Sequence, residues 1–135
     1  IAITPRIETR ILRKSDNDHI TIIAAGITLH EALNAYSELW KEGIFARVID
    51  LYSIKPIDQA TIHEAAQATK AIITVEDHFA EGGIGEAVRT ALGAIAVPVY
   101  SLSVRKMPKS GKPEELLDYE EISANAIIKQ VKEII

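Results

Sequence analysis

The sequence predicts a three-layer α/β domain, in which one sheet lies between two layers of helices. Four apolar runs rich in β-branched residues begin roughly 25 residues apart, which is the spacing of strand–helix–strand units. Helical patterns fill the gaps between these runs. A further run near the start of the chain alternates apolar and polar residues and predicts a strand at the edge of the sheet.

The predicted strands differ in how completely their sequence patterns indicate burial. The four apolar runs are Ile20–Ala25, Ala46–Leu51, Ala71–Val75 and Val97–Val104. The first three are nearly continuous, as is typical of parallel strands covered on both faces. The fourth alternates more and is expected nearer an edge. In the opening run, Ile7, Thr9 and Ile11 alternate with charged residues, and an antiparallel direction is one option for this strand.

Capping residues mark the ends of the predicted helices. The first helix begins with a capping box between Thr28 and Glu31 and ends at Gly43. Its apolar face consists of Leu29, Leu33, Tyr36 and Trp40, joined by Ala32 and Leu39. Asp58 is expected to cap the second helix and Ser123 the last one.

Composition limits the classes of function. Apolar residues make up 47% of the 135 residues, enough for a core, and the net charge of −4 argues against nucleic acid as the main partner. The absence of cysteine excludes disulfides and thiol catalysis and is typical of a cytoplasmic protein. No apolar run approaches the length of a membrane span, so a membrane partner is not expected.

We expect one domain over residues 1–135, with an edge strand and lead-in at 1–18 and the α/β core at 19–135. The only methionine is Met107, and the chain opens with "IAITPRIETR". Because a native chain normally begins with methionine or the remnant of its processing, we expect the chain to be part of a longer polypeptide. The alternative is a small free-standing protein that has been trimmed.

The stretch "EDHFAEGGIGEA", Glu76 to Ala87, is the strongest candidate site. It links a predicted strand to a helix expected from about Gly85 to Gly93, and open α/β sheets bind ligands at such corners. Glycines there let backbone N–H groups face an anion. The dinucleotide fingerprint fails, however, because Val88 stands where its third glycine or alanine belongs, and the surrounding acids would repel phosphate. A tight turn with close helix packing is therefore the preferred interpretation.

The acids and the histidine of this stretch are also candidate metal ligands. Glu76, Asp77, His78 and Glu81 carry donor atoms that divalent cations use. Their spacing matches no known metal-binding loop, and acids ahead of a helix have an ordinary explanation in the helix dipole. We therefore predict no metal ligand and no catalytic set in this chain.

A second candidate is the basic loop "VRKMPKSGKP". Gly111 and Lys112 partly match a phosphate-binding loop, but Pro113 replaces its serine or threonine and Lys106 replaces its first glycine. A solvated loop and an interface remain equal alternatives for this segment. The candidate interface or anion-binding residues of the two segments are Asp77, His78, Glu81, Gly82, Gly83, Gly85, Arg105, Lys109 and Lys112.

The glycine stretch and its neighbours together resemble the C-terminal domain of transketolase. The matching pieces are "IIAAGITLHEAL", "ARVIDLYSIKPID", "ATKAIITVEDHFAEGGIGEAV" and "SVRKMPKSGKPEELL", which extend from about His19 toward the end of the chain. The most specific piece is "VEDH" followed by "EGGIGEAV". Related domains end the β subunits of 2-oxo-acid dehydrogenases and the deoxyxylulose-phosphate synthases. Because these typically lack the histidine and the Ser-Gly-Lys-Pro loop, transketolase is favoured.

The resemblance implies a mixed sheet of five strands, four parallel and an antiparallel N-terminal edge strand. It also implies a parent enzyme that uses thiamine diphosphate and Mg²⁺ to transfer a two-carbon ketol unit between sugar phosphates in the pentose phosphate pathway. That cofactor lies between pyrophosphate- and pyrimidine-binding domains of two subunits, both upstream of this domain. No catalytic or cofactor-binding residue is therefore expected here. The implied partners are those two domains and a second subunit.

Two other functions remain open. One is a regulatory module for an anion or nucleotide, in which Arg105, Lys109 and Lys112 meet the glycine loop. The other is a partner-docking domain, as in the C-terminal domain of a dehydrogenase β subunit or a deoxyxylulose-phosphate synthase.

Overall fold

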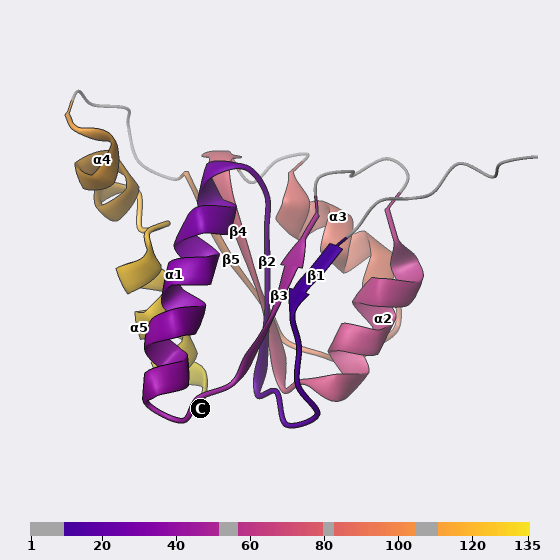
Figure 1. Ribbon diagram of the computed structural model, residues 1–135. Coiled ribbons are helices and arrows are strands. Elements are labelled where there is room, and N and C mark those ends of the chain that lie inside the picture. Colours follow the sequence, from indigo (N-terminus) through magenta and orange to yellow (C-terminus); the bar gives the residue numbers. More distant parts are fainter. Residues whose placement is uncertain (1–9, 52–56, 80–82, 105–110) are drawn as a thin grey trace, which may run out of the picture.

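The computed structural model describes residues 10–51, 57–79, 83–104 and 111–135 (Figure 1). The strands in these ranges are β1 (Arg10–Arg13), β2 (Ile20–Ala24), β3 (Ala46–Asp50), β4 (Ala71–Phe79) and β5 (Val99–Val104). The helices are α1 (Ile27–Lys41), α2 (Gln59–Ala68), α3 (Ile84–Leu92), α4 (Pro113–Tyr119) and α5 (Ala124–Ile134). The first part of the predicted edge strand, with Ile7 and Thr9, lies outside the described residues.

The strands form one sheet in the order β1-β3-β2-β4-β5. Neighbouring strands from β3 to β5 are parallel, whereas β1 runs antiparallel to β3 and pairs Arg10 with Asp50. The predicted mixed sheet with an antiparallel N-terminal edge strand is therefore confirmed. The carboxyl ends of the four parallel strands meet at one edge of the sheet, where α1 and α3 also begin (Figure 1).

Helices cover both faces of the sheet, which gives three layers (Figure 1). On one face α1 and α5 enclose a core that includes Ile22, Val48 and Ile73, all 0% exposed. On the other face α2 and α3 enclose a core that includes Ile49 and Ile72. Burial on both faces is the reason that β2, β3 and β4 are nearly continuous apolar runs.

Two of the three predicted N-terminal caps are confirmed. Asp58 Oδ1 accepts a hydrogen bond from the Thr61 N–H at 3.1 Å, and Ser123 Oγ accepts one from the Ala126 N–H at 3.3 Å. Each cap satisfies a backbone donor that has no partner within its helix. The predicted end of α1 is also confirmed, because Gly43 follows the helix with a φ of +75°, the left-handed conformation that favours glycine.

The predicted start of α1 is wrong. The helix begins at Ile27 with Gly26 as its N-cap, so Thr28 lies inside the first turn and caps nothing. Thr28 Oγ1 instead lies 2.9 Å from the carbonyl oxygens of both Ala25 and Val75, and its proton is donated to this pair. The contact with Val75 fastens α1 to β4. A local capping pattern does not reveal it, because the acceptor comes from a strand far away in the sequence.

Two side chains also depart from helical periodicity. Trp40, predicted on the apolar face of α1, is 51% exposed and packs edge-on against Phe45 with 4.8 Å between ring centroids. His63 of α2 is half-buried, and its Nε2 lies 2.6 Å from the carbonyl oxygen of Ala91 in α3. In both cases a neighbouring element supplies a contact that the helix alone does not predict.

Candidate functional site

The candidate site lies at the carboxyl edge of the sheet, where β4 ends and α3 begins. β4 continues past its predicted end at Val75 and reaches Phe79, because pairing with β5 resumes at Phe79 and Val104. Glu76 is therefore a strand residue, and the prediction that the loop begins near it is wrong. The predicted start of α3 is correct to within one residue.

The carboxylate of Glu76 binds the N-terminus of α3. The residue is 1% exposed, and its two carboxylate oxygens accept hydrogen bonds from the N–H groups of Ile84 at 2.8 Å and Gly85 at 2.9 Å. These donors belong to the first turn of the helix, where no intrahelical acceptor exists and where the helix dipole favours negative charge. Glu76 therefore fills the position at which open α/β sheets bind an external anion.

Gly85 lets α3 begin close to the sheet. A Cβ built on Gly85 would lie 2.6 Å from Ser101 Oγ and 3.2 Å from Thr74 Oγ1. These two hydroxyl groups belong to β5 and β4 and lie 3.2 Å from each other in a hydrogen bond. Because Gly85 has no side chain, its N–H comes within reach of Glu76. This close approach supports the interpretation of the glycine segment as a site of close helix packing.

The structure describes only some of the remaining candidate residues. Gly83 is the buried N-cap of α3, Asp77 is exposed in β4, and His78 lies in β4 with its side chain outside the described part of the chain. Glu81, Gly82, Arg105 and Lys109 also lie outside the described residues.

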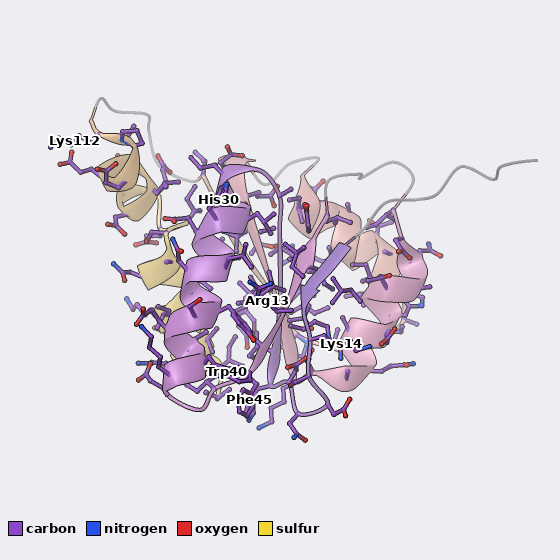
Figure 2. The ribbon with its side chains drawn as sticks, viewed as in Figure 1. Arg13, Lys14, His30, Trp40, Phe45 and Lys112 are labelled. Atoms are coloured by element: carbon purple, nitrogen blue, oxygen red, sulfur yellow. The ribbon has the colours of Figure 1, made fainter. Side chains whose placement is uncertain are left out.

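Lys112 is the one residue of the basic candidate set that falls within the described ranges. It is exposed at the start of α4, where its N–H donates to Glu115 Oε2 at 3.3 Å (Figure 2). α4 packs through Leu117 against the core under α1 and α5, whereas α3 packs on the opposite face of the sheet. The structure therefore does not place Lys112 beside the glycines of α3.

The described part of the chain offers no cluster for a metal ion. Within it, no group of three or more histidine, aspartate and glutamate side chains could hold one. Both oxygens of Glu76 already accept hydrogen bonds from backbone N–H groups, so the role of this carboxylate is to fasten α3 to the sheet.

Within the described residues, no helix has the length and apolar character needed to cross a membrane.

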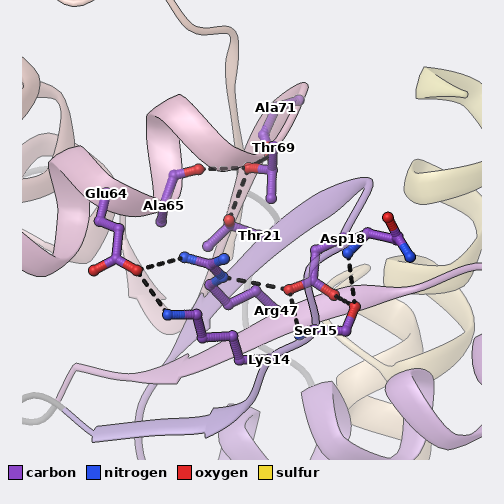
Figure 3. A network of polar contacts seen from close by, with 10 residues as sticks. Lys14, Ser15, Asp18, Thr21, Arg47, Glu64, Ala65, Thr69 and Ala71 are labelled. Carbon is purple, nitrogen blue, oxygen red and sulfur yellow. Dashed lines mark hydrogen bonds and ion pairs between the residues drawn. The ribbon is translucent and has the colours of Figure 1, made fainter.

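A second polar group, which we call the amino-edge cluster, lies at the opposite edge of the sheet and consists of Lys14, Ser15, Asp18, Arg47 and Glu64 (Figure 3). Arg47 of β3 is buried; its Nε donates to Asp18 Oδ2 at 3.4 Å, and its NH1 lies 3.6 Å from Glu64 Oε1. Lys14 Nζ lies 2.7 Å from the same Glu64 oxygen. Asp18 also accepts hydrogen bonds from the N–H and the hydroxyl of Ser15 at 2.9 and 2.6 Å.

The sequence reasoning missed this cluster. The one available signal is the arginine within the apolar run "ARVID", because a buried charge requires a partner. The sequence does not reveal which acids supply that partner, since Asp18 precedes β2 and Glu64 lies on α2.

The amino-edge cluster predicts that the contribution of Glu64 to the free energy of unfolding depends on pH. The hydrogen bond and charge of Lys14, and then the charge of Arg47, hold the pKa of Glu64 below its ordinary value of 4.5. A carboxyl whose pKa is lowered by folding stabilises the protein above its unfolded pKa, and this contribution is lost as the pH falls through the folded pKa. Glu64→Gln should therefore be less stable than wild type at neutral pH, and the difference should shrink as the pH falls below 4.5 and through the lowered pKa of Glu64.

Urea unfolding of both proteins from pH 7 down to pH 3 measures this difference in the free energy of unfolding. Glu38→Gln, which removes an exposed carboxylate paired with Lys41 on α1, is the matched control. A difference between wild type and Glu64→Gln that persists undiminished into acid would contradict the role assigned to Glu64.

Comparison with known proteins identifies the family. Residues 9–127 match the family described as "Transketolase, C-terminal domain". Transketolase-like protein 2 of Mus musculus is 52% identical over 130 residues, which cover 95% of this chain and 21% of that protein. Transketolase of Mus musculus is 48% identical over 130 residues, with the same shares of 95% and 21%. The chain thus spans about a fifth of the length of the curated relatives it matches.

The fold comparison agrees with the sequence comparison. The solved structure titled "Split gene transketolase, inactive beta4 tetramer" superposes with a TM-score of 0.87 at 33% identity, and the match covers 99% of this chain and 44% of that chain. The family match extends over nearly the whole described sheet and includes Glu76 and Gly85. This chain therefore belongs to the family of transketolase C-terminal domains.

Proposed function

We propose that the chain is the C-terminal domain of a transketolase and that it supports domain packing and dimerisation without taking part in the chemistry. The parent enzyme would transfer a two-carbon ketol unit between sugar phosphates in the cytoplasm. Its partners would be the pyrophosphate- and pyrimidine-binding domains and a second subunit. The family membership supports this proposal, as does the length of the relatives, of which this chain matches about a fifth.

The single observation that carries the supporting role is the occupied N-terminus of α3. A diphosphate group would need backbone N–H donors or cations, and the donors of Ile84 and Gly85 already bind Glu76. The described residues also offer no group of side chains for a divalent metal. The described residues therefore do not fit thiamine diphosphate and Mg²⁺, which would be held by the other domains of the parent enzyme.

The length and activity of the native polypeptide test the proposal. An antibody to this domain would recover the native protein, and intact mass and a ketol-transfer assay would follow. We expect a chain several times longer than 135 residues that is active with thiamine diphosphate and Mg²⁺, whereas the 135-residue chain alone is inactive. A form of the longer polypeptide without this domain should show a smaller dimer fraction in sedimentation.

A native chain of about 135 residues would reject the proposal, because the domain would then work apart from any thiamine site. The regulatory and partner-docking functions would be favoured in that case. Ketol transfer by the isolated 135-residue chain would also reject it.

A further inference from the structure

β1 is held to the domain differently from the other strands. Within the described residues it has four residues, it pairs with β3 alone, and its register shifts between Ile11 and Arg13. Ile11 is 38% exposed, Leu12 is exposed and Arg13 is exposed, whereas all five residues of β2 are buried. Apolar burial by these residues therefore contributes less to the attachment of β1 than to that of β2.

Two adjacent cations fasten β1 to the helices on either side of it. The guanidinium of Arg13 lies over the ring of Tyr36 in α1, 5.4 Å from its centroid. The ammonium group of Lys14 lies 2.7 Å from Glu64 Oε1 in α2. Figure 2 shows Arg13 on the side of the strand toward α1 and Lys14 on the side toward α2. These two charged contacts add to the backbone pairing of β1 with β3, and each is of the small size that exposed ion pairs and cation–π contacts have.

Glu64 is the centre of this attachment. The same oxygen that pairs with Lys14 is also 3.6 Å from the NH1 atom of Arg47. This NH1 atom is buried and makes no hydrogen bond with the described residues. Removing the charge of Glu64 would take away the acid that both Lys14 and Arg47 contact, and would leave the Asp18 contact of Arg47 in place. The side chain of Glu64 is 54% exposed, so dissolved salt reaches it and screens its ion pairs.

α2 is anchored independently of Glu64. Beyond the end of this helix, the hydroxyl of Thr69 lies 2.8 Å from that of Thr21 in β2 and 2.8 Å from the carbonyl oxygen of Ala65 (Figure 3). Ile62 and Ala65 are fully buried against the sheet. When the ion pairs of Glu64 are broken, the part free to move is therefore β1 rather than α2.

We propose that β1 is a detachable strand, held by the Lys14–Glu64 ion pair and the Arg13–Tyr36 contact, which leaves β3 when these charges are screened or removed while the parallel core stays folded. Release uncovers the edge of β3, which another strand can then pair with. Under the proposed function, the other domains precede this one in the chain, and β1 is the first described element after them. The attachment of β1 therefore also sets how firmly this domain is held to the other domains. That last consequence rests on the proposed function, whereas the release of the strand does not.

Hydrogen exchange of the 135-residue chain, followed by mass spectrometry, tests the proposal. We expect the amides of β1 to exchange faster in Glu64→Gln than in wild type by a factor between roughly 1.5 and five, the range set by an exposed ion pair. Arg13→Gln should have an effect of similar size, and raising the NaCl concentration should speed β1 exchange in wild type. Exchange in β2 and β4 should stay unchanged throughout.

Glu38→Gln is the matched control, because it removes an exposed ion pair from α1 that does not touch β1. Equal β1 exchange in Glu64→Gln and wild type would overturn the proposal. It would also be overturned if β1 exchanged only together with β2 and β4, because the strand would then belong to the cooperative core. Neither result depends on whether the parent protein is a transketolase.

Discussion

Gly85→Val should lower the free energy of unfolding by roughly 3 kcal/mol, in the upper part of the range for an over-packed core. The added side chain would begin with a Cβ only 2.6 Å from Ser101 Oγ and 3.2 Å from Thr74 Oγ1. To relieve this overlap, α3 must move away from the sheet, and this motion also lengthens the hydrogen bond from Gly85 to Glu76. Urea unfolding of the variant and the wild type measures the change.

A double-mutant cycle identifies the cause of this loss. Gly85→Ala places one methyl group against Ser101, and alanine is otherwise the better helix former by about 1 kcal/mol. In a Ser101→Ala background the closest atom, Ser101 Oγ, is absent. Gly85→Ala should therefore lower the free energy of unfolding less in that background than in the wild type. Equal costs in the two backgrounds would show that contact with Ser101 is not the reason for the glycine.

Glu76→Ala should cost about 3 kcal/mol, because it leaves two buried N–H donors without an acceptor and removes a charge at the helix N-terminus. Glu76→Gln should cost less, since its amide oxygen can still accept a hydrogen bond from the N–H of Ile84 or of Gly85. Its NH2 group cannot accept the other hydrogen bond. Thermal or urea unfolding of the purified variants measures both values.

The matched control for Glu76 is Asp77→Asn. Asp77 is the next residue of β4 and is exposed, so its replacement should lower the free energy of unfolding clearly less than that of Glu76. The account of Glu76 fails if the two positions respond equally, because burial and the hydrogen bonds to α3 are what distinguish them.

The fold could be predicted from the sequence because its signals are local or periodic. Runs such as Ile20–Ala24 are nearly continuous in apolar residues since both faces of that strand are buried, and Asp58 and Ser123 cap the helices that immediately follow them. The errors occur where a distant element decides the outcome. β4 is longer than expected because β5 pairs with its far end, and Thr28 bonds to β4 instead of capping α1.

The place of the glycine segment between a strand and a helix could be predicted, but the contacts made there could not. The acids beside the glycines indicated that phosphate would be repelled, yet the pattern does not reveal which acid turns inward. Only the fold shows that Glu76 reaches the N–H groups of Ile84 and Gly85. The partners of Arg47 were also beyond sequence reasoning, because β3, α2 and the segment before β2 meet only in space.

Glu76 occupies the position at the N-terminus of α3 at which an external anion would otherwise bind. The most direct test is a titration of the 135-residue chain with inorganic phosphate, with the amide resonances of Ile84 and Gly85 followed by NMR. Glu76→Ala titrated with formate is the positive control, since formate can replace the missing carboxylate. We expect both resonances to stay in place in the wild type and to shift in the variant. Saturable shifts of both amides in the wild type would contradict the account and would establish an anion site in its place.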